Sequence, residues 1–374
     1  MKIQMCDLVG QYKKIQSAID EAMSQVINSS AFINGPQVKE FKTSLEKYTG
    51  AKHVIPCANG TDALQISLMA LDLQPGDEVI VPAFTYVAAA EVIGLLRLVP
   101  VMVDVDDVSF NITLNNIEKG LSPKTKAIIP VHLFGQSCPM EEIMDFAQKY
   151  GLFVVEDNAQ AIGARYTFSN GMERQAGTIG HIGCTSFFPT KNLGCFGDGG
   201  AMMCEDDALA ERLRIMTVHG QTVKYHHELL GCNSRLDTLQ AAILNVKLQH
   251  LDEYIQARQQ AAKIYSNGLA GIDGITLPKE MSYSTHVYHQ YTLKVKAGKR
   301  NALKKYLSEK GVPSMIYYPL PLNEQNAFKA ITRAAENLNV SKELSESVLS
   351  LPMHTELTAE EMDYIIYTVK SFFN

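Results

Sequence analysis

The chain has 374 residues, 46% of them hydrophobic, and a formal net charge of −6 at pH 7. This length supports one large and one smaller domain with sizeable cores, and the mixing of acidic and basic residues along the chain argues against a nucleic-acid partner. The seven scattered cysteines indicate neither a disulfide framework nor a metal site, and without a signal peptide or an apolar run of membrane-spanning length they fit a cytoplasmic protein.

Apolar runs typical of strands alternate with amphipathic helical segments over most of the first two thirds of the chain. The predicted strands are Glu78–Pro82, Pro100–Val105, Ala127–Val131, Phe153–Asp157, Cys184–Phe188 and Ala201–Cys204. The predicted helices are Asp62–Ala70, Ala88–Leu96, Glu141–Lys149 and Asp207–Met216. This alternation predicts a mostly parallel sheet with helices on both faces.

The pattern changes after a long, polar-faced helix predicted for Tyr254–Leu269. Beyond this helix the predicted elements are the strands Ile275–Leu277, His289–Val295 and Ser314–Tyr318 and the helices Asn301–Lys310 and Thr358–Phe373. We therefore expect a large domain over residues 1–252 and a small α+β domain over residues 253–374.

The first candidate site residues, Gly60 and Thr61, open the helix that is predicted before Ala70. A helix that begins on glycine presents free N–H groups and the positive end of its dipole, which suit a phosphate. Many helices begin in this way without binding an anion, so these two residues alone are a weak signal.

Asp157 follows the apolar run 152–155 and is expected to end the strand that this run begins. This run is typical of a buried parallel strand, and open α/β sheets bind ligands at the carboxyl ends of their strands. A carboxylate in that place can pair with a pyridinium nitrogen and keep it protonated. Asp157 could instead cap the following helix.

Lys191 lies in the stretch SFFPTKNLG (residues 186–194), which the glycine-rich segment 197–200 follows. A lysine amine forms imines readily once its surroundings lower its pKa, and pyridoxal phosphate enzymes need such a lysine. A solvated loop lysine is the alternative for Lys191 taken alone. The order of phosphate site, ring-nitrogen carboxylate and Schiff-base lysine is far more specific than any one of them.

With these motifs the chain resembles the DegT/StrS family of sugar aminotransferases, which are fold-type I pyridoxal phosphate enzymes. The resemblance extends from the residues GPQV (35–38) to the residues LPMH (351–354). It implies an α/β fold, with a large domain built on a mostly parallel sheet of the seven-stranded type and a small α+β C-terminal domain. It also implies transamination with pyridoxal 5′-phosphate (PLP), which takes its pyridoxamine (PMP) form between the two half-reactions.

The resemblance assigns roles to matching residues. It implies that Lys191 forms the Schiff base and shuttles a proton, and that Asp157 pairs with the ring nitrogen. It implies that Gln160 bonds the phenolic oxygen of the ring and that Tyr86 stacks on the ring, although without the resemblance Gln160 could cap backbone and Tyr86 could be a core residue. The residues that match the phosphate site are Gly60, Thr61 and Ser186.

Two later segments match the family as well. Residues 225–237 read by themselves as a polar loop before a helix, but the resemblance implies that they reach the active site of a partner subunit in a homodimer. Asn233 would then contact the cofactor phosphate, while His227 and Arg235 would serve the substrate. In the C-terminal domain, Tyr317 and Tyr318 match a segment near the sugar, where relatives often carry histidine at the position of Tyr317.

The reaction implied is the transfer of the amino group of L-glutamate to a keto carbon of a nucleotide-linked sugar. The 3-keto form of UDP-N-acetylglucosamine uronate is the preferred acceptor, and a 3-keto-6-deoxyhexose on dTDP is the alternative. A catalytically silent regulatory protein on the same scaffold is an alternative of another class. Related dehydratases carry histidine in place of the lysine, so the presence of Lys191 favours transamination.

Overall fold

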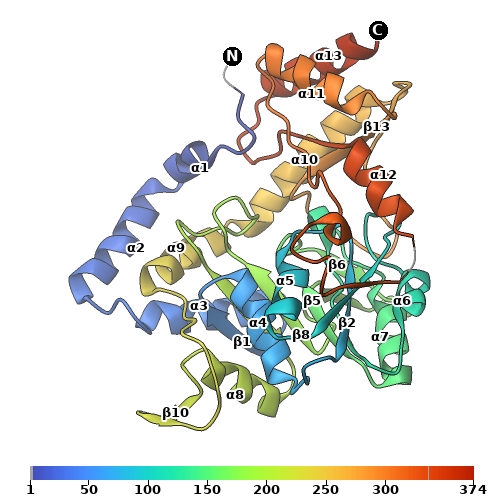
Figure 1. Cartoon of the computed structure of the whole chain (residues 1–374). Helices are drawn as coiled ribbons and strands as arrows, with labels where there is room; N and C mark the ends of the chain where they lie inside the picture. Colours follow the sequence, from blue (N-terminus) through green and yellow to red (C-terminus); the bar gives the residue numbers. More distant parts are fainter. Residues whose placement is uncertain (1–2, 336) are drawn as a thin grey trace.

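A computed structural model describes residues 3–335 and 337–374. At its centre is an eight-stranded sheet with the strand order β1-β9-β8-β5-β4-β2-β3-β14 (Figure 1). In this order the strands are β1 (His53–Cys57), β9 (Gly200–Cys204), β8 (Ile182–Ser186), β5 (Phe153–Asp157), β4 (Thr125–Ile128), β2 (Glu78–Pro82), β3 (Val99–Val103) and β14 (Arg333–Ala334).

Most neighbouring strands of this sheet run parallel. β2 pairs in parallel with β3 and β4, and β5 pairs in parallel with β4 and β8. The exception is β9, which lies antiparallel between β1 and β8. The predicted mostly parallel sheet is confirmed, and β14 joins it as an additional edge strand because Arg333 and Ala334 pair in parallel with β3.

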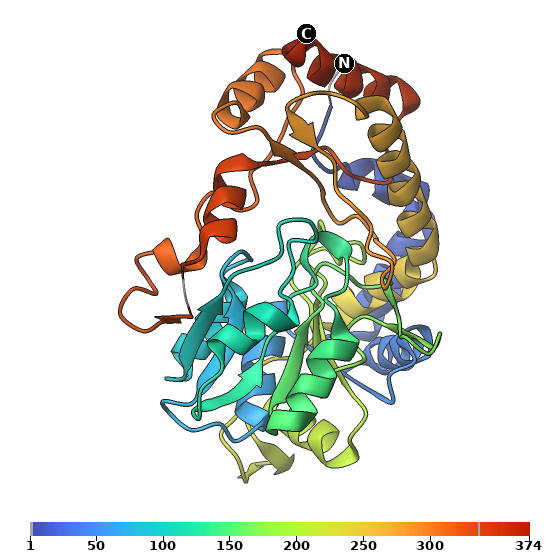
Figure 2. The ribbon, with the colours of Figure 1, turned by 90° about the vertical axis from the view of Figure 1, so that its right-hand side faces the viewer.

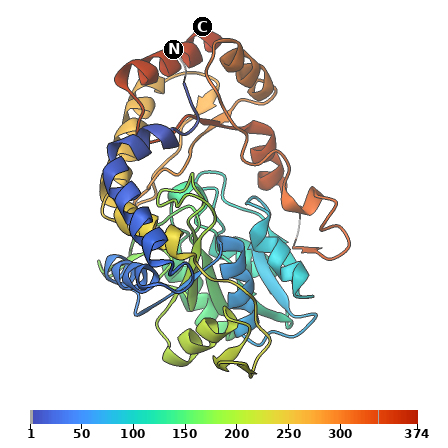
Figure 3. The same cartoon turned by 90° about the vertical axis from the view of Figure 1, so that its left-hand side faces the viewer.

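Helices cover both faces of the sheet. They are α4 (Gly60–Ala70), α5 (Ala88–Leu95), α6 (Leu114–Gly120), α7 (Met140–Tyr150) and α8 (Asp207–Met216). α4 packs against α5 and α8, whereas α6 packs against α7. Figure 2 shows α7 in front of the sheet, and Figure 3, from the opposite side, shows α4 in front of it. Strands buried in this way need apolar residues on both faces, and every residue of β2 is buried.

The helices before the first strand support the site from behind. They are α1 (Leu8–Lys14), α2 (Gln16–Ser29) and α3 (Pro36–Thr49), and both α2 and α3 pack against α9 (Thr238–Leu248). Phe41 of α3 and Leu244 of α9 are buried in one hydrophobic cluster with Phe187 and Leu193. Since Phe187 and Leu193 flank Lys191 in the sequence, this cluster anchors the turn that carries the lysine.

The C-terminal part forms a smaller α+β unit. Its elements are α10 (Leu251–Leu269), β12 (Ile275–Thr276), β13 (Tyr291–Val295), α11 (Arg300–Glu309), α12 (Asn339–Ser347), β15 (Val348–Leu351) and α13 (Ala359–Phe373). Its hydrophobic cluster also contains Ile3, and both chain ends lie at this end of the molecule (Figure 1). The boundary after residue 252 stays a prediction, since the N-terminal end contributes to the C-terminal core.

Two short hairpins complete the fold. They consist of β6 (Arg165–Thr167) with β7 (Glu173–Gln175) and β10 (Gln221–Val223) with β11 (His226–His227). Among the residues that the structure describes, no helix is long and apolar enough to cross a lipid bilayer.

One of the predicted strands, Ser314–Tyr318, is wrong. This segment forms a single bridge, between Met315 and Ser350, and the strand that pairs with β13 is β15. Tyr317 packs on the cluster of the large sheet, and Ile316 packs on that cluster and on the C-terminal one, so the two side chains bridge the two parts and do not alternate across a small sheet. The prediction also missed β1, which forms the edge of the large sheet.

The segment after Tyr318 returns to the large sheet. Leu322 donates its backbone N–H to the carbonyl of Ala83, at 2.8 Å, just beyond β2. Further on, Arg333 forms an ion pair of 2.8 Å with the nearly buried Glu78 at the other end of β2. Tyr317 and Tyr318 therefore lie over the carboxyl ends of the parallel strands.

Candidate active site

Asp157 is held at the end of β5 by backbone bonds on both sides. Its N–H donates to the carbonyl of Pro130 at 2.9 Å, and its own carbonyl accepts from the N–H of His132 at 3.0 Å. The neighbouring strand β8 runs parallel and pairs Asp157 with Cys184. Asp157 thus lies at the carboxyl edge of the sheet, where open α/β folds bind ligands.

Lys191 lies in a tight turn that connects β8 to β9. Its N–H donates to the carbonyl of Phe188 at 2.8 Å, and the N–H of Cys195 returns to the carbonyl of Phe187 at 2.8 Å. A Cβ atom at Gly194 would lie 2.4 Å from the carbonyl oxygen of Pro189, so the turn closes this tightly only with glycine there. The close approach of the backbone to Gly194 therefore explains why the motif has glycine at this position.

Lys191 and Asp157 interact electrostatically. Burial lowers the pKa of Lys191 to about 8, and the charge of Asp157 opposes this shift. Burial also raises the pKa of Asp157, against the N–H of Ala159 and the charge of Lys191. An amine with a pKa near 8 is partly neutral at physiological pH, which is the state that attacks a carbonyl.

The predicted phosphate residues converge from two elements. A Cβ atom at Gly60 would lie 2.7 Å from the Cβ of Ser186, so the first turn of α4 touches the end of β8. Asn59 caps α4 by accepting from the N–H of Asp62 at 2.8 Å. The N–H groups of Gly60 and Thr61 belong to the helix start, where no carbonyl of the same helix is available. This corner can hold an anion.

Gln160 is oriented at both ends of its amide. Its Oε1 accepts from the N–H of Phe134 at 2.7 Å, and its Nε2 donates to the hydroxyl of Tyr318 at 3.1 Å. Burial raises the pKa of Tyr318, so this hydroxyl stays protonated and can pass on a hydrogen bond. The structure thus links Gln160 to a residue of the C-terminal segment.

An aromatic group surrounds Tyr318. The ring centroids of Phe84, Tyr86 and Tyr317 lie 6.1, 6.3 and 6.0 Å from that of Tyr318. Phe84 is buried in the core, whereas 56% of Tyr86 is exposed. A large aromatic ring that is left uncovered beside the site is available for stacking on a planar ligand.

The polar loop between β10 and α9 does not reach this site within one chain. The Nδ1 atom of His227 lies 2.9 Å from the carbonyl of His219, Asn233 is exposed, and Arg235 lines a separate hollow of about 380 Å³ beside α3 and α8. In the described chain no hydrogen bond or ion pair joins these three side chains to Lys191 or Asp157. Among the described residues, no ion pair joins Arg235 to Asp237 or Glu228, the acidic residues nearest to it in this loop.

A buried His132–Glu156 pair, which the sequence did not single out, supports Asp157. The Nε2 atom of His132 lies 2.8 Å from Oε2 of Glu156, and its Nδ1 accepts from the N–H of Cys138 at 3.1 Å. Glu156 also accepts three backbone N–H groups from residues 177–180. The carboxylate next to Asp157 in sequence therefore faces away from the site and fixes the end of β5.

His289 is a second residue that the sequence did not single out. It is buried, its Nδ1 has no hydrogen-bond partner in the described chain, and its pKa is lowered by burial and by the charges of Lys191 and Arg258. The loop that carries it packs on Phe134 through the N–H of Gln290. Nothing in the local sequence connects this loop to a lysine so distant along the chain.

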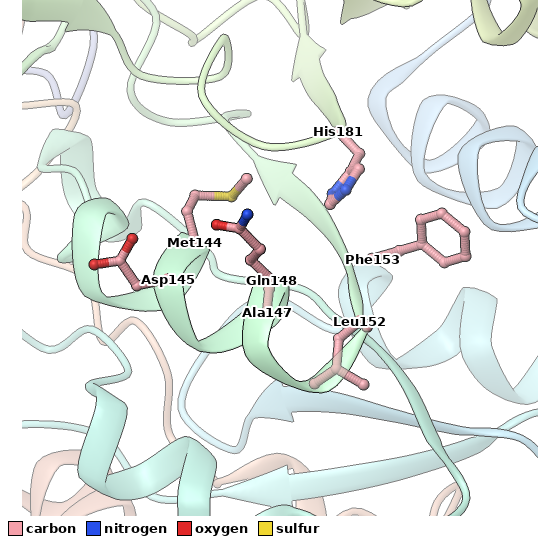
Figure 4. A pocket seen from close by; sticks show the side chains of 8 residues that line it. Met144, Asp145, Ala147, Gln148, Leu152, Phe153 and His181 are labelled. Atoms are coloured by element: carbon pink, nitrogen blue, oxygen red, sulfur yellow. The ribbon is translucent and has the colours of Figure 1, made fainter.

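A hollow of about 460 Å³ lies elsewhere, beside α7, and its lining includes Met144, Gln148, Phe153 and His181 (Figure 4). Phe153 begins β5, whereas Asp157 ends it. The hollow is therefore at the opposite edge of the sheet from Lys191. The Nδ1 atom of His181 accepts from the N–H of Val154 at 2.9 Å, so this ring is part of the frame.

The chain is similar to known proteins over nearly its whole length. A Geobacillus stearothermophilus protein named pleiotropic regulatory protein is 44% identical over 100% of this chain and 99% of its own length. The UDP-2-acetamido-2-deoxy-3-oxo-D-glucuronate aminotransferase of Pseudomonas aeruginosa is 43% identical, with 97% of this chain and 98% of that protein covered.

Solved structures are similar over the whole chain. DesV of S. venezuelae, solved in complex with a ketimine intermediate, superposes with a TM-score of 0.95 at 35% identity over 100% of this chain and 99% of that one. NtdA of Bacillus subtilis, solved with bound cofactor PMP, has a TM-score of 0.88 at 31% identity over 96% and 82%. The model of the DegT/DnrJ/EryC1/StrS aminotransferase family matches residues 13–370, and the chain therefore belongs to this family.

Proposed function

We propose that this chain is a PLP-dependent transaminase that moves the amino group of L-glutamate to the 3-keto carbon of a UDP-N-acetylglucosamine uronate. The observation that carries the reaction type is the half-buried Lys191, with a pKa of about 8, beside the buried carboxylate of Asp157. The Pseudomonas relative, which acts on a 3-oxo-glucuronate, supports the choice of sugar.

The residues of the site fit the cofactor. Among described residues, the Asp157 carboxylate accepts one hydrogen bond, from the N–H of Ala159 to Oδ1, so its other oxygen is free for a cationic ring N–H. The corner of Gly60, Thr61 and Ser186 fits the phosphate, and Tyr86 fits the ring face. PLP, when bound, supplies the electron sink for transamination, taking the PMP form between half-reactions.

The protein contributes position, charge and a proton carrier. Lys191 Nζ takes the proton from the reacting carbon of glutamate and returns a proton at the reacting carbon of the sugar, which its pKa near neutrality favours. Asp157 supplies a fixed negative charge in a buried place, where its effect is larger than in water. Gln160 and Tyr318 hold one edge of the site through their hydrogen bond.

The active site is composite in this proposal, built from two subunits of a homodimer. The loop that carries His227, Asn233 and Arg235 projects from one chain with large apolar side chains uncovered: Tyr225 is 78% exposed and Leu230 is 89% exposed. Apolar side chains in such positions are typical of a surface that another chain covers. We propose that the partner subunit is that chain and that Asn233 contacts the cofactor phosphate across the interface.

We expect inactive Lys191→Ala chains and inactive Asn233→Asp chains to regain activity when they are mixed and allowed to exchange. Each heterodimer then holds one site with both residues unaltered, so activity should approach about a quarter of that of the parent enzyme for random exchange and one competent site in half of the dimers. The measurement is glutamate-dependent amination after subunit exchange has been verified by native mass spectrometry. Exchange without regained activity would rule out Asn233 acting in trans.

The sugar and the role of Arg235 are tested together with two matched 3-keto sugars, one a uronate and one a neutral 6-deoxy sugar. We expect the parent enzyme to aminate the uronate faster in single turnovers. Arg235→Lys keeps the charge but loses the planar fork that holds a carboxylate through two hydrogen bonds. We expect it to weaken the reactions of both the uronate and glutamate about tenfold or more and to leave the single turnover of the neutral sugar nearly unchanged.

Arg214→Lys is the matched control, because Arg214 lines the same hollow but pairs with Glu211 on the surface of α8. A parent enzyme that prefers the neutral sugar would contradict the uronate. Unchanged kinetics of Arg235→Lys with both the uronate and glutamate would contradict the role of the arginine.

A regulatory protein without catalysis is the second candidate, because the Geobacillus relative is named as a regulatory protein. The presence of Lys191, Asp157 and Gln160 together at one edge of the sheet favours catalysis, since a protein that had lost activity would have no need of all three. Bleaching of the yellow holoprotein by glutamate separates the two candidates, because a silent protein would show no such change.

A further inference from the structure

Two basic side chains are buried on helices that follow each other, and the charge of one lies within electrostatic range of the other. Lys247, near the end of α9, is 2% exposed, and Arg258, on α10, is 3% exposed. Lysine and arginine are rarely buried to this degree unless a carboxylate pairs with them. In the part of the chain that the structure describes, no ion pair involves either residue.

The described groups that act on the ammonium of Lys247 are an aromatic ring, two thiols and Arg258, with no carboxylate among them. Its Nζ lies 5.6 Å from the centroid of the Phe196 ring, and no hydrogen bond to another described residue compensates its charge. Burial lowers the pKa of Lys247 to about 8; Cys195 and Cys6 oppose the shift, and Arg258 adds to it. The ammonium group is thus destabilised by its surroundings, in the way that binding sites destabilise charged groups before a ligand arrives.

Arg258 is held firmly but its charge is not neutralised. Its Nη1 donates to the carbonyls of Tyr288 at 3.1 Å, His289 at 3.4 Å and Met353 at 3.1 Å, and its Nε has no partner in the described chain. Burial lowers the pKa of this guanidinium too. The peptide carbonyls accept hydrogen bonds from the guanidinium group but do not neutralise its charge. Lys247 and Arg258 are therefore buried cationic groups without an opposing carboxylate.

This pair borders the reacting groups. The carbonyl of His289 accepts from Arg258, and the ring of His289 is within electrostatic range of Lys191. Phe196, under the ammonium group of Lys247, belongs to the segment that follows Lys191. Cys6 lies within electrostatic range of both cations and of Tyr317. Lys247 thus lies against the segment that follows Lys191, through Phe196, and Arg258 binds the backbone of the loop that carries His289.

We propose that Lys247, backed by Arg258, is a carboxylate subsite of the active site, a proposal that rests on the transaminase function proposed above. A carboxylate that enters this place neutralises a charge whose burial is otherwise uncompensated. Two carboxylates of the reaction have the right chemistry: the distal carboxylate of glutamate and the carboxylate of the uronate. In the proposed dimer, the partner subunit's loop supplies one arginine, Arg235. Glutamate brings two carboxylates, so a second cationic group also has a carboxylate to bind.

The pH dependence follows from the neutral state of the lysine. A bound carboxylate raises the pKa of Lys247 above 8, so affinity is full below pH 8 and falls as the pH rises above it. The other titratable groups that face Lys247 are Cys6, Cys195 and Arg258. Burial raises the pKa of both thiols, so they stay neutral over this range.

The experiment compares the holoenzyme with Lys247→Met, which removes the charge at similar length, and Lys247→Arg, which keeps it. Lys304→Met is the matched control, because Lys304 is a partly buried lysine whose Nζ donates to a carbonyl, that of Ser314 at 2.9 Å, in the C-terminal unit. Single turnovers are measured with glutamate against glutamine and with a 3-keto uronate against a neutral 3-keto sugar. Calorimetric titration with glutarate measures carboxylate binding without turnover.

We expect Lys247→Met to weaken binding of the carboxylate ligand on the order of tenfold to a hundredfold, with its neutral counterpart unchanged. Lys247→Arg should restore binding and remove the decline above pH 8, because an arginine keeps its proton there. A loss confined to glutamate and glutarate assigns the subsite to the donor, and a loss confined to the uronate assigns it to the sugar.

Equal weakening of charged and neutral ligands would assign Lys247 a structural role and overturn the subsite, as would unchanged binding in both arms. Failure of the proposed function has a different signature. In that case the parent holoenzyme does not react with glutamate at all, while the glutarate titration still decides whether Lys247 binds a carboxylate.

Discussion

Replacing Lys191 by alanine will reduce glutamate-dependent amination by about a thousandfold or more, because the variant loses both the Schiff-base nucleophile and the proton carrier. The fold should remain, since Lys191 contributes no side-chain hydrogen bond or ion pair within the described chain, and the turn is held by backbone bonds and by the burial of Phe187 and Leu193. The measurements are single-turnover kinetics and circular dichroism.

The same residue is tested by chemistry. Borohydride reduction of the parent holoenzyme followed by peptide mapping should mark Lys191, and the rate of imine formation in the apoprotein should rise as the pH passes about 8, because the neutral amine is the nucleophile. Lys149→Ala, at the exposed end of α7, is the control and should keep full activity. A mark on another lysine would contradict the assignment.

Replacing Asp157 by asparagine will reduce kcat on the order of a hundredfold to a thousandfold, equivalent to about 3–4 kcal/mol of transition-state stabilisation. The change removes a charge at nearly constant shape, and the buried place of Asp157 makes that charge count more than it would in water. A neutral amide in this place cannot keep the ring nitrogen protonated. The measurement is kcat at saturating glutamate, with cofactor content determined by absorbance.

Asp145→Asn is the matched control, since Asp145 lies on α7 beside the hollow at the opposite edge of the sheet (Figure 4). It should behave as the parent enzyme does. If Asp157→Asn turns over at the parent rate with cofactor bound, Asp157 does not pair with the ring nitrogen.

Short-range patterns in the sequence were sufficient for much of the large domain. The strands Glu78–Pro82 and Phe153–Asp157 were predicted with the bounds that the structure has, because a buried parallel strand is recognisable as a continuous apolar run with a clear end. The order of Gly60, Asp157 and Lys191 along the chain is also visible in the sequence. The roles of these residues stay predictions, but their gathering at one edge follows from parallel strands that share a direction.

What the local sequence could not determine depends on partners that are far apart along the chain. Ser314–Tyr318 has the composition of a strand, yet β13 pairs with Val348–Leu351. The periodicity within a segment does not determine which of two apolar segments pairs with a given strand.

The contact of Gly60 with Ser186, the hydrogen bond from Gln160 to Tyr318 and the burial of Lys247 and Arg258 are likewise products of tertiary packing. The sequence by itself determined which chemical groups the protein has and roughly which elements carry them. The tertiary structure alone decided which of these groups lose their water and meet, because burial and pairing are properties of the packed chain and not of any one segment.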